Sequence, residues 1–287
     1  MAPKIQWPLV LFSLLAGCGG CAFAFAGLAN ALGAAPSVTC TVTIVSFVVA
    51  CIGGLCSVVH LATPKNAWAV VTHILSFSGI SVELIALGVT CALMVAFVAS
   101  VWLGAAAVVT LVLGLAGALA GVWLAFATGH GYLISSKPTW NTMKLPVAYL
   151  ATSFMAGGFL YLTVLQLMGA ETPHLIVVLA AAGVVFSVVA VLAYMAHLGT
   201  ATATKDGRLF WGGIVACGMG LPVLCAALML AFPNAAFSGA LVIAGLAASL
   251  IGGLSLRMLM WIVGAGFLSF FVYAQEHRSV ILNVASE

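Results

Sequence analysis

The segment from His60 to Glu83 gathers ionisable side chains in a chain that has very few of them. Its members are His60, Lys65, His73 and Glu83, whereas only 5% of the 287 residues are charged. A histidine titrates near neutral pH, so His60 could accept a proton from a substrate hydroxyl, and Glu83 could relay that proton to water. Oxidation of a quinol needs such a base beside an apolar cleft, because a quinol leaves as two electrons and two protons.

The same two residues also have a purely structural interpretation. His60 could be an interfacial histidine that bonds a backbone carbonyl. Glu83 could be a solvated acid that the dipole of a helix N-terminus favours. Residue types and spacing leave both interpretations open.

Arg257 is the third candidate, because it lies inside the apolar run 237–273. A guanidinium cannot shed its charge, so burying it is costly unless it meets a carboxylate, a ligand or water. We expect its partner on the same side of the membrane as His60 and Glu83. The alternative is a side chain that snorkels to the lipid head groups.

A facing polar segment, 128–145, contains His130, Tyr132, Lys137 and Trp140. His130 and Trp140 are weaker site candidates, as are Asn66 and Trp68 beside Lys65.

No metal site is expected. A haem needs axial ligands that face each other from neighbouring helices. His60, His130 and His197 each end an apolar run instead of lying within one, so we expect no haem. The eight cysteines lie mostly inside apolar runs, which predicts no iron–sulfur cluster in this chain. The Cys18-x-x-Cys21 pair lies among glycines and alanines, which favours close helix packing.

The elements that must position these side chains are membrane-spanning helices. Hydrophobic residues make up 65% of the chain and the mean hydropathy is +1.31, whereas soluble domains are about 45–50% apolar. Runs of about 20 apolar residues span a bilayer as helices, while barrel strands would alternate over about 10 residues. The net charge of +3 includes no basic run, which argues against a nucleic-acid partner.

The apolar runs predict an all-α integral membrane protein with eight transmembrane helices in one polytopic domain over residues 1–287. Eight such helices can pack as two four-helix bundles. The predicted spans cover about 8–32, 39–61, 84–102, 105–127, 146–168, 174–197, 210–232 and 237–259.

Positive charge is concentrated on one side of these spans. Eight crossings place both termini and the three long loops on one side, which we name side A; the opposite side is side B. Side A receives seven of the eight Lys and Arg residues, namely Lys4, Lys65, Lys137, Lys144, Lys205, Arg208 and Arg278. The positive-inside rule then predicts a cytoplasmic-membrane protein with both termini in the cytoplasm. Long loops on one face are typical of a docking surface for a soluble partner.

The chain carries five short motifs in order, namely Trp7-Pro8-Leu9-Val10-Leu11-Phe12, His60-Leu61-Ala62-Thr63-Pro64 followed by Glu83, Lys137-Pro138-Thr139-Trp140, Phe154-Met155-Ala156-Gly157-Gly158 and Arg257 in the last span. Together these motifs resemble the membrane-anchor subunit family of dimethyl sulfoxide reductase. The chain departs from that family's pattern at Ala62, where Gly is usual, and at Asn66, where Arg is usual.

The resemblance implies a membrane anchor that oxidises menaquinol, its bound substrate, and passes electrons to a four-cluster iron–sulfur subunit. Through that subunit the electrons would reach a molybdopterin catalytic subunit, so the resemblance implies no molybdenum in this chain. The expected quinol-binding and proton-transfer residues are His60, Lys65, Glu83 and Arg257. Two alternatives stay open: a small-solute transporter, which would place ionisable residues near the bilayer midplane in broken helices, and a structural anchor without a quinone site.

Overall fold

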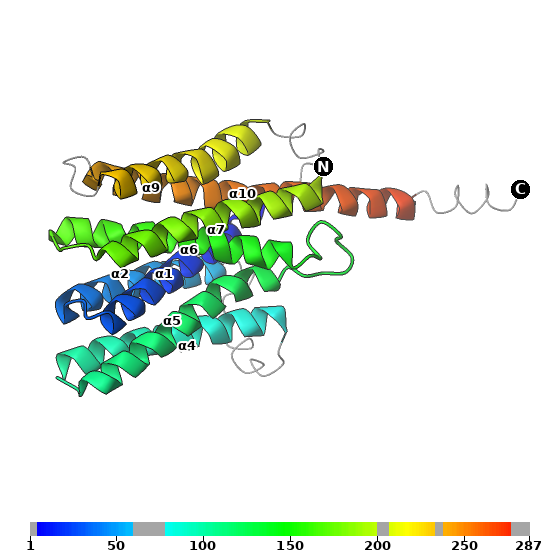
Figure 1. Cartoon of the computed structure of the whole chain (residues 1–287). Helices are drawn as coiled ribbons and strands as arrows, with labels where there is room; N and C mark the ends of the chain where they lie inside the picture. Colours follow the sequence, from blue (N-terminus) through cyan, green and yellow to red (C-terminus); the bar gives the residue numbers. More distant parts are fainter. Residues whose placement is uncertain (1–4, 60–77, 200–206, 233–237, 277–287) are drawn as a thin grey trace, which may run out of the picture.

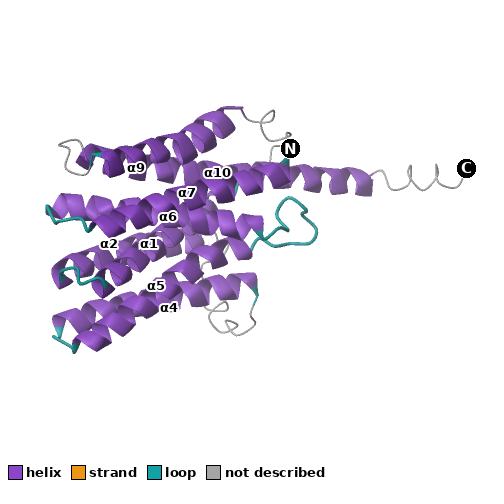
Figure 2. Cartoon of the chain, in the orientation of Figure 1, coloured by secondary structure: helices purple, strands orange, loops and turns teal. Residues whose placement is uncertain are grey.

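The structure is a computed structural model that describes residues 5–59, 78–199, 207–232 and 238–276, the last twelve as backbone only. Within these ranges the chain is helical, with short connecting turns and one longer loop, 131–143, between the helices that end at His130 and begin at Lys144 (Figure 2). Eight helical spans are long and apolar enough to cross a membrane. They are α1 (Trp7–Ala31), α2 (Pro36–Val59), α4 (Gly79–Trp102), α5 (Ala107–His130), α6 (Lys144–Met168), α7 (His174–Leu198), η3 (Arg208–Gly220) continued by α9 (Leu221–Ala231), and α10 (Ser238–Glu276).

The helices form two four-helix bundles in chain order (Figure 1). In the first, α1, α2, α4 and α5 each pack against two neighbours, and in the second α6, α7, η3–α9 and α10 do the same. The bundles meet mainly where α6 packs against α1 and α5. These contacts bury most of α1 and α6, while the other spans keep a broad apolar surface for lipid. The predicted all-helical, two-bundle membrane fold is therefore confirmed.

Glycines allow the closest helix contacts. A Cβ on Gly121 of α5 would overlap the carbonyl oxygen of Gly20 in α1, and a Cβ on Gly27 would overlap that of Gly114. Gly157 of α6 lies against Cys21, where an added Cβ would come within 2.6 Å of the cysteine Cβ. Cys18 and Cys21 are free and buried. Small residues thus form the helix seams here, as they commonly do in membranes.

Some helix ends differ from the predicted spans. Helix α4 begins at Gly79, where the sequence predicted a span from about 84, so Glu83 lies within its first two turns. Helix α10 runs on to Glu276 as one helix, beyond the predicted end near 259. The seventh span changes from π-helical to α-helical geometry at Leu221, next to Pro222, which has no backbone N–H to donate.

Side A is one end of the molecule (Figure 1). Because neighbouring spans alternate in direction, this end carries the start of α1, the end of α5, the loop 131–143 and the start of α6. The start of α4 lies there too, which brings Glu83 close to the loop that follows α5.

Candidate functional site

Glu83 lies at the side A end of α4, against the end of α5. The side chain of Ser78 caps α4 by accepting a hydrogen bond from the Ser81 backbone N–H at 3.3 Å. A Cβ on Gly79 would lie 3.2 Å from the Gly131 Cα, and a Cβ on Gly131 would overlap Oε1 of Glu83. Gly131 therefore makes room for the carboxylate. Glu83 is partly buried and forms no hydrogen bond or ion pair with another described residue.

Next to Gly131, four aromatic rings pack against one another, and we name them the aromatic cluster. They belong to Tyr132, Trp140, Tyr149 and Trp261. Tyr132 packs edge to face against Trp140, Tyr149 and Trp261, with ring centroids 5.6, 5.9 and 6.0 Å away. Trp140 and Trp261 are also in contact, at 5.0 Å. The rings come from the loop after α5, from α6 and from α10, so this aromatic cluster joins elements of both bundles.

The loop cation Lys137 covers the aromatic cluster. Its Nζ lies 3.4 Å from the Trp140 ring centroid and 5.8 Å from that of Trp261, in cation–π geometry. Trp140 is buried and donates its indole N–H to the Met260 carbonyl at 2.9 Å. The Trp261 indole N–H is buried without an acceptor among the described residues.

Two groups of this end, both outside the spans, have shifted pKa values. Burial, and then the nearby Tyr149 and Glu83, raises the pKa of the Tyr132 hydroxyl well above its usual value, while Arg257 opposes the shift. Tyr132 therefore stays a proton donor throughout the physiological range. Partial burial lowers the pKa of Lys137 from its usual value.

Arg257 lies next to the aromatic cluster, on the side toward the middle of the spans, and it is completely buried. Its Nε donates to the Ser13 hydroxyl at 3.0 Å, and one terminal nitrogen donates to the Ser13 carbonyl at 3.3 Å and the Ser153 hydroxyl at 3.1 Å. The other donates to the Gly253 carbonyl at 3.0 Å and the Thr152 hydroxyl at 3.4 Å. These contacts engage the five N–H donors of the guanidinium.

The surroundings of Arg257 settle how its charge is held. Ser13 is the seventh residue of α1, about 9 Å from the side A end of that helix, so Arg257 lies in the side A half of the molecule. It does not snorkel, and its hydrogen-bond partners in the described ranges include no carboxylate. The Arg257 Cζ stands 4.4 Å from the Tyr149 ring centroid. A positive charge that has no ion-pair partner among the described residues therefore lies directly behind the aromatic cluster.

The structure brings together only some of the predicted site residues. Glu83, Trp140 and Arg257 lie at one end and are connected through Tyr132 and Tyr149. His130 is exposed, with its ring against Phe126 at 5.9 Å. The remaining predicted residues, His60, Lys65, Asn66 and Trp68, lie outside the described residues.

Sequence reasoning missed the residues that connect these groups. Tyr149, Trp261 and the hydroxyls around Arg257 lie inside apolar spans, where ionisable residues are conspicuous and aromatic or hydroxyl side chains are not. A usable signal was present, since a permanent cation inside a span needs acceptors and Ser13, Thr152 and Ser153 are hydroxyls within apolar helices.

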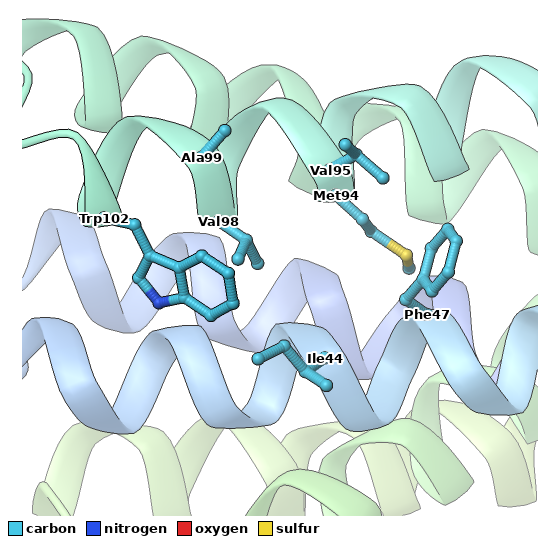
Figure 3. Close-up of a pocket in the computed structure, with 7 residues that line it drawn as sticks. All are labelled: Ile44, Phe47, Met94, Val95, Val98, Ala99 and Trp102. Carbon is cyan, nitrogen blue, oxygen red and sulfur yellow. The ribbon is translucent and has the colours of Figure 1, made fainter.

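An apolar groove of about 210 Å³ lies between α2 and α4 at the other end of the first bundle (Figure 3). Trp102, Val98 and Ile44 are among its lining residues. Trp102 is about 28 Å along α4 from Glu83. This groove is therefore separate from Glu83 and the aromatic cluster at side A. The described residues contain no group of three or more His, Cys, Asp or Glu side chains that could hold a metal ion.

The family model described as DMSO reductase anchor subunit (DmsC) matches residues 1–207. No curated protein matches the chain.

Proposed function

Since this chain belongs to the family of DMSO reductase anchor subunits, we propose that it oxidises menaquinol at side A for a molybdopterin oxidoreductase complex. The observation that carries the proposal is Glu83. Its carboxylate lies beside an aromatic cluster and in front of a buried positive charge, and it has no ion-pair partner among the described residues.

Glu83 acts as a proton acceptor in this proposal. Oxidation of one quinol releases two protons and two electrons, so the head group needs bases at the site. His60 takes a proton from a quinol hydroxyl, and Glu83 takes or relays one toward the side A surface. Lys65, Asn66 and Trp68 follow His60 closely in the chain and complete the head-group contacts, while the two electrons pass to the partner subunit.

Arg257 acts through its charge. Because its five N–H donors are engaged by the protein, it serves as a fixed positive potential behind Tyr149 and not as a donor to a quinone oxygen. Such a potential favours the anionic state that a quinol reaches when it loses a proton. Trp140 supports the wall of the site, and the exposed His130 lies at its margin.

Side A is also the docking face in this proposal. The partners are a four-cluster iron–sulfur subunit and, beyond it, the molybdopterin catalytic subunit. Lys137, Lys144 and Arg208 are the described loop and helix-end cations, and all three are at this end. Positive charge there also supports an orientation in the cytoplasmic membrane with both termini in the cytoplasm.

The experiment compares Glu83→Gln with wild type in membranes that carry the co-expressed complex. Removing a base lowers proton-transfer steps by about 10²-fold to 10⁴-fold, so we expect oxidation of a menaquinol analogue to fall at least about 100-fold. Activity with an artificial donor that bypasses the anchor should persist, as should binding of the partner subunits.

The matched control is Glu171→Gln, which removes the same charge at side B. It should leave quinol oxidation unchanged. If Glu83→Gln and His60→Ala both keep full quinol oxidation, the chain is a structural anchor without a quinone site. The transporter alternative instead predicts solute uptake by vesicles that contain this chain alone.

A further inference from the structure

A second cavity lies at side B, away from the proposed quinol site. It has a volume of about 470 Å³ and opens where α6, α7, α9 and α10 end or begin. Small-molecule sites in proteins have volumes of about 300–1,000 Å³. Ionisable and polar side chains form part of its lining, namely Gln166, Glu171, Thr172, His174 and Ser238.

The inner wall of the cavity is apolar. Leu162, Met229 and Val242 are buried in the second bundle, and Val177 is partly buried beside them. The cavity therefore has a polar mouth and an apolar floor. A ligand that matches both parts is an amphiphile, and a bilayer presents amphiphiles to this end of the molecule at high local concentration.

Two side chains at the opening of the cavity, Glu171 and His174, indicate which lipid head group would fit there. Glu171 is exposed in the turn between α6 and α7, and it forms no ion pair with another described residue. Its carboxylate suits an ammonium group. His174 is the first residue of α7, three positions along the chain, where an imidazole and the positive end of the helix dipole favour a phosphate.

A buried hydroxyl points to the same kind of ligand. Ser238 lines this cavity, and its Oγ is buried without a hydrogen-bond partner in the described part of the chain. Gln166 lies against Gly239, where an added Cβ would be 3.0 Å from the amide nitrogen. The first turn of α10 thus places a buried hydroxyl without a described partner, and the exposed amide of Gln166, beside this cavity.

We propose that this side B cavity binds a phospholipid whose phosphate carries a primary ammonium group. The ammonium pairs with Glu171, the phosphate lies near His174, and the first part of an acyl chain lies against Val177 and Val242. This site is independent of quinol oxidation.

Native mass spectrometry of the purified complex tests the proposal. The protein is equilibrated with equal amounts of phosphatidylethanolamine and phosphatidylglycerol, which share the phosphate but differ in the ammonium. An exposed ion pair corresponds to a few-fold change in affinity, so we expect about five-fold more retained phosphatidylethanolamine than phosphatidylglycerol.

Variants assign this preference to the cavity. Glu171→Gln should bring the retention ratio close to one, while Glu83→Gln, the same change at side A, should keep the wild-type ratio. Val177→Phe fills the apolar part and should reduce retention of both lipids. Equal retention of the two lipids by wild type, or an unchanged ratio in Glu171→Gln, would overturn the proposal.

A soluble head group separates a lipid site from a site for a free amine. Millimolar phosphoethanolamine should leave the bound lipid in place, because it lacks the chain that contacts the apolar floor. If it displaces the lipid, the cavity binds a soluble ligand and the lipid proposal is wrong. The Glu171→Gln protein should oxidise quinol normally, so failure here is distinguishable from failure of the quinol proposal.

Discussion

Arg257 shows how a single residue can carry a permanent charge inside a membrane span. Its partners are hydroxyls and backbone carbonyls from α1, α6 and its own helix. Ser13 donates its own hydrogen to the Val10 carbonyl, and Thr152 donates to the Ala148 carbonyl. Each hydroxyl thus keeps a lone pair for the guanidinium. We name these hydroxyl and carbonyl acceptors the Arg257 cage. Their arrangement fits the planar guanidinium of arginine and not the compact ammonium of lysine.

Arg257→Lys should therefore be a disruptive substitution. An ammonium has three donors and cannot reach all the acceptors that the guanidinium engages, which leaves buried polar groups without partners. We expect a loss of stability of about 2–4 kcal/mol, measured as a lower Tm in detergent. Arg208→Lys at the exposed start of η3 is the control and should leave Tm unchanged. If Arg257→Lys had the same Tm as wild type, the contacts of the guanidinium would not contribute to stability and this prediction would be wrong.

Close contacts between helices position the site at the scale of the elements. Helix α4 reaches the end of α5 because Gly79 faces Gly131, and the carboxylate of Glu83 occupies the space beside Gly131. Gly131 has an ordinary helical backbone conformation. Its lack of a side chain is therefore required by the neighbouring carboxylate and not by its φ angle.

Gly131→Ala should displace the Glu83 carboxylate. We expect quinol oxidation to fall about ten-fold, in line with a modest displacement of a catalytic base. Assays of quinol and artificial-donor oxidation on the same membranes measure this. The control is Gly88→Ala, on a part of α4 where an added Cβ meets nothing within 4 Å; it should preserve both activities. Full quinol oxidation by Gly131→Ala would show that the contact is unimportant.

The whole molecule consists of two bundles that are joined along α6. Arg257 and the aromatic cluster lie across this junction. Arg257 of the second bundle donates to Ser13 of the first, and Tyr132 follows α5 of the first bundle while it packs on Trp261 of the second. A change at the cluster is therefore coupled to how the bundles pack. The two ends also differ in charge, with Lys137 at side A and Glu171 at side B.

The orientation of the molecule can be tested by labelling. Each native cysteine lies within a span, so single cysteines introduced at the two ends report on separate faces. Glu171→Cys should react with a membrane-impermeant maleimide from outside the cell, and Lys137→Cys should react only after the membrane is opened. The reverse pattern would place side A outside and would mean that partner docking, and not topology, explains the lysines.

The sequence by itself determined the fold class, the number of spans and the short set of residues worth testing. These depend on local properties: a run of apolar residues of bilayer length forms a helix wherever it occurs, and a charge inside such a run is conspicuous. The tertiary structure decided which of those residues meet. In the folded chain Arg257 donates to buried hydroxyls, and the Trp140 indole N–H donates to a backbone carbonyl. His130 is exposed, and Tyr149 packs against Arg257 although the sequence did not predict it as a site residue. Such contacts depend on how each helix is rotated against helices distant in the chain, and an almost uniformly apolar helix carries little periodic signal for that rotation.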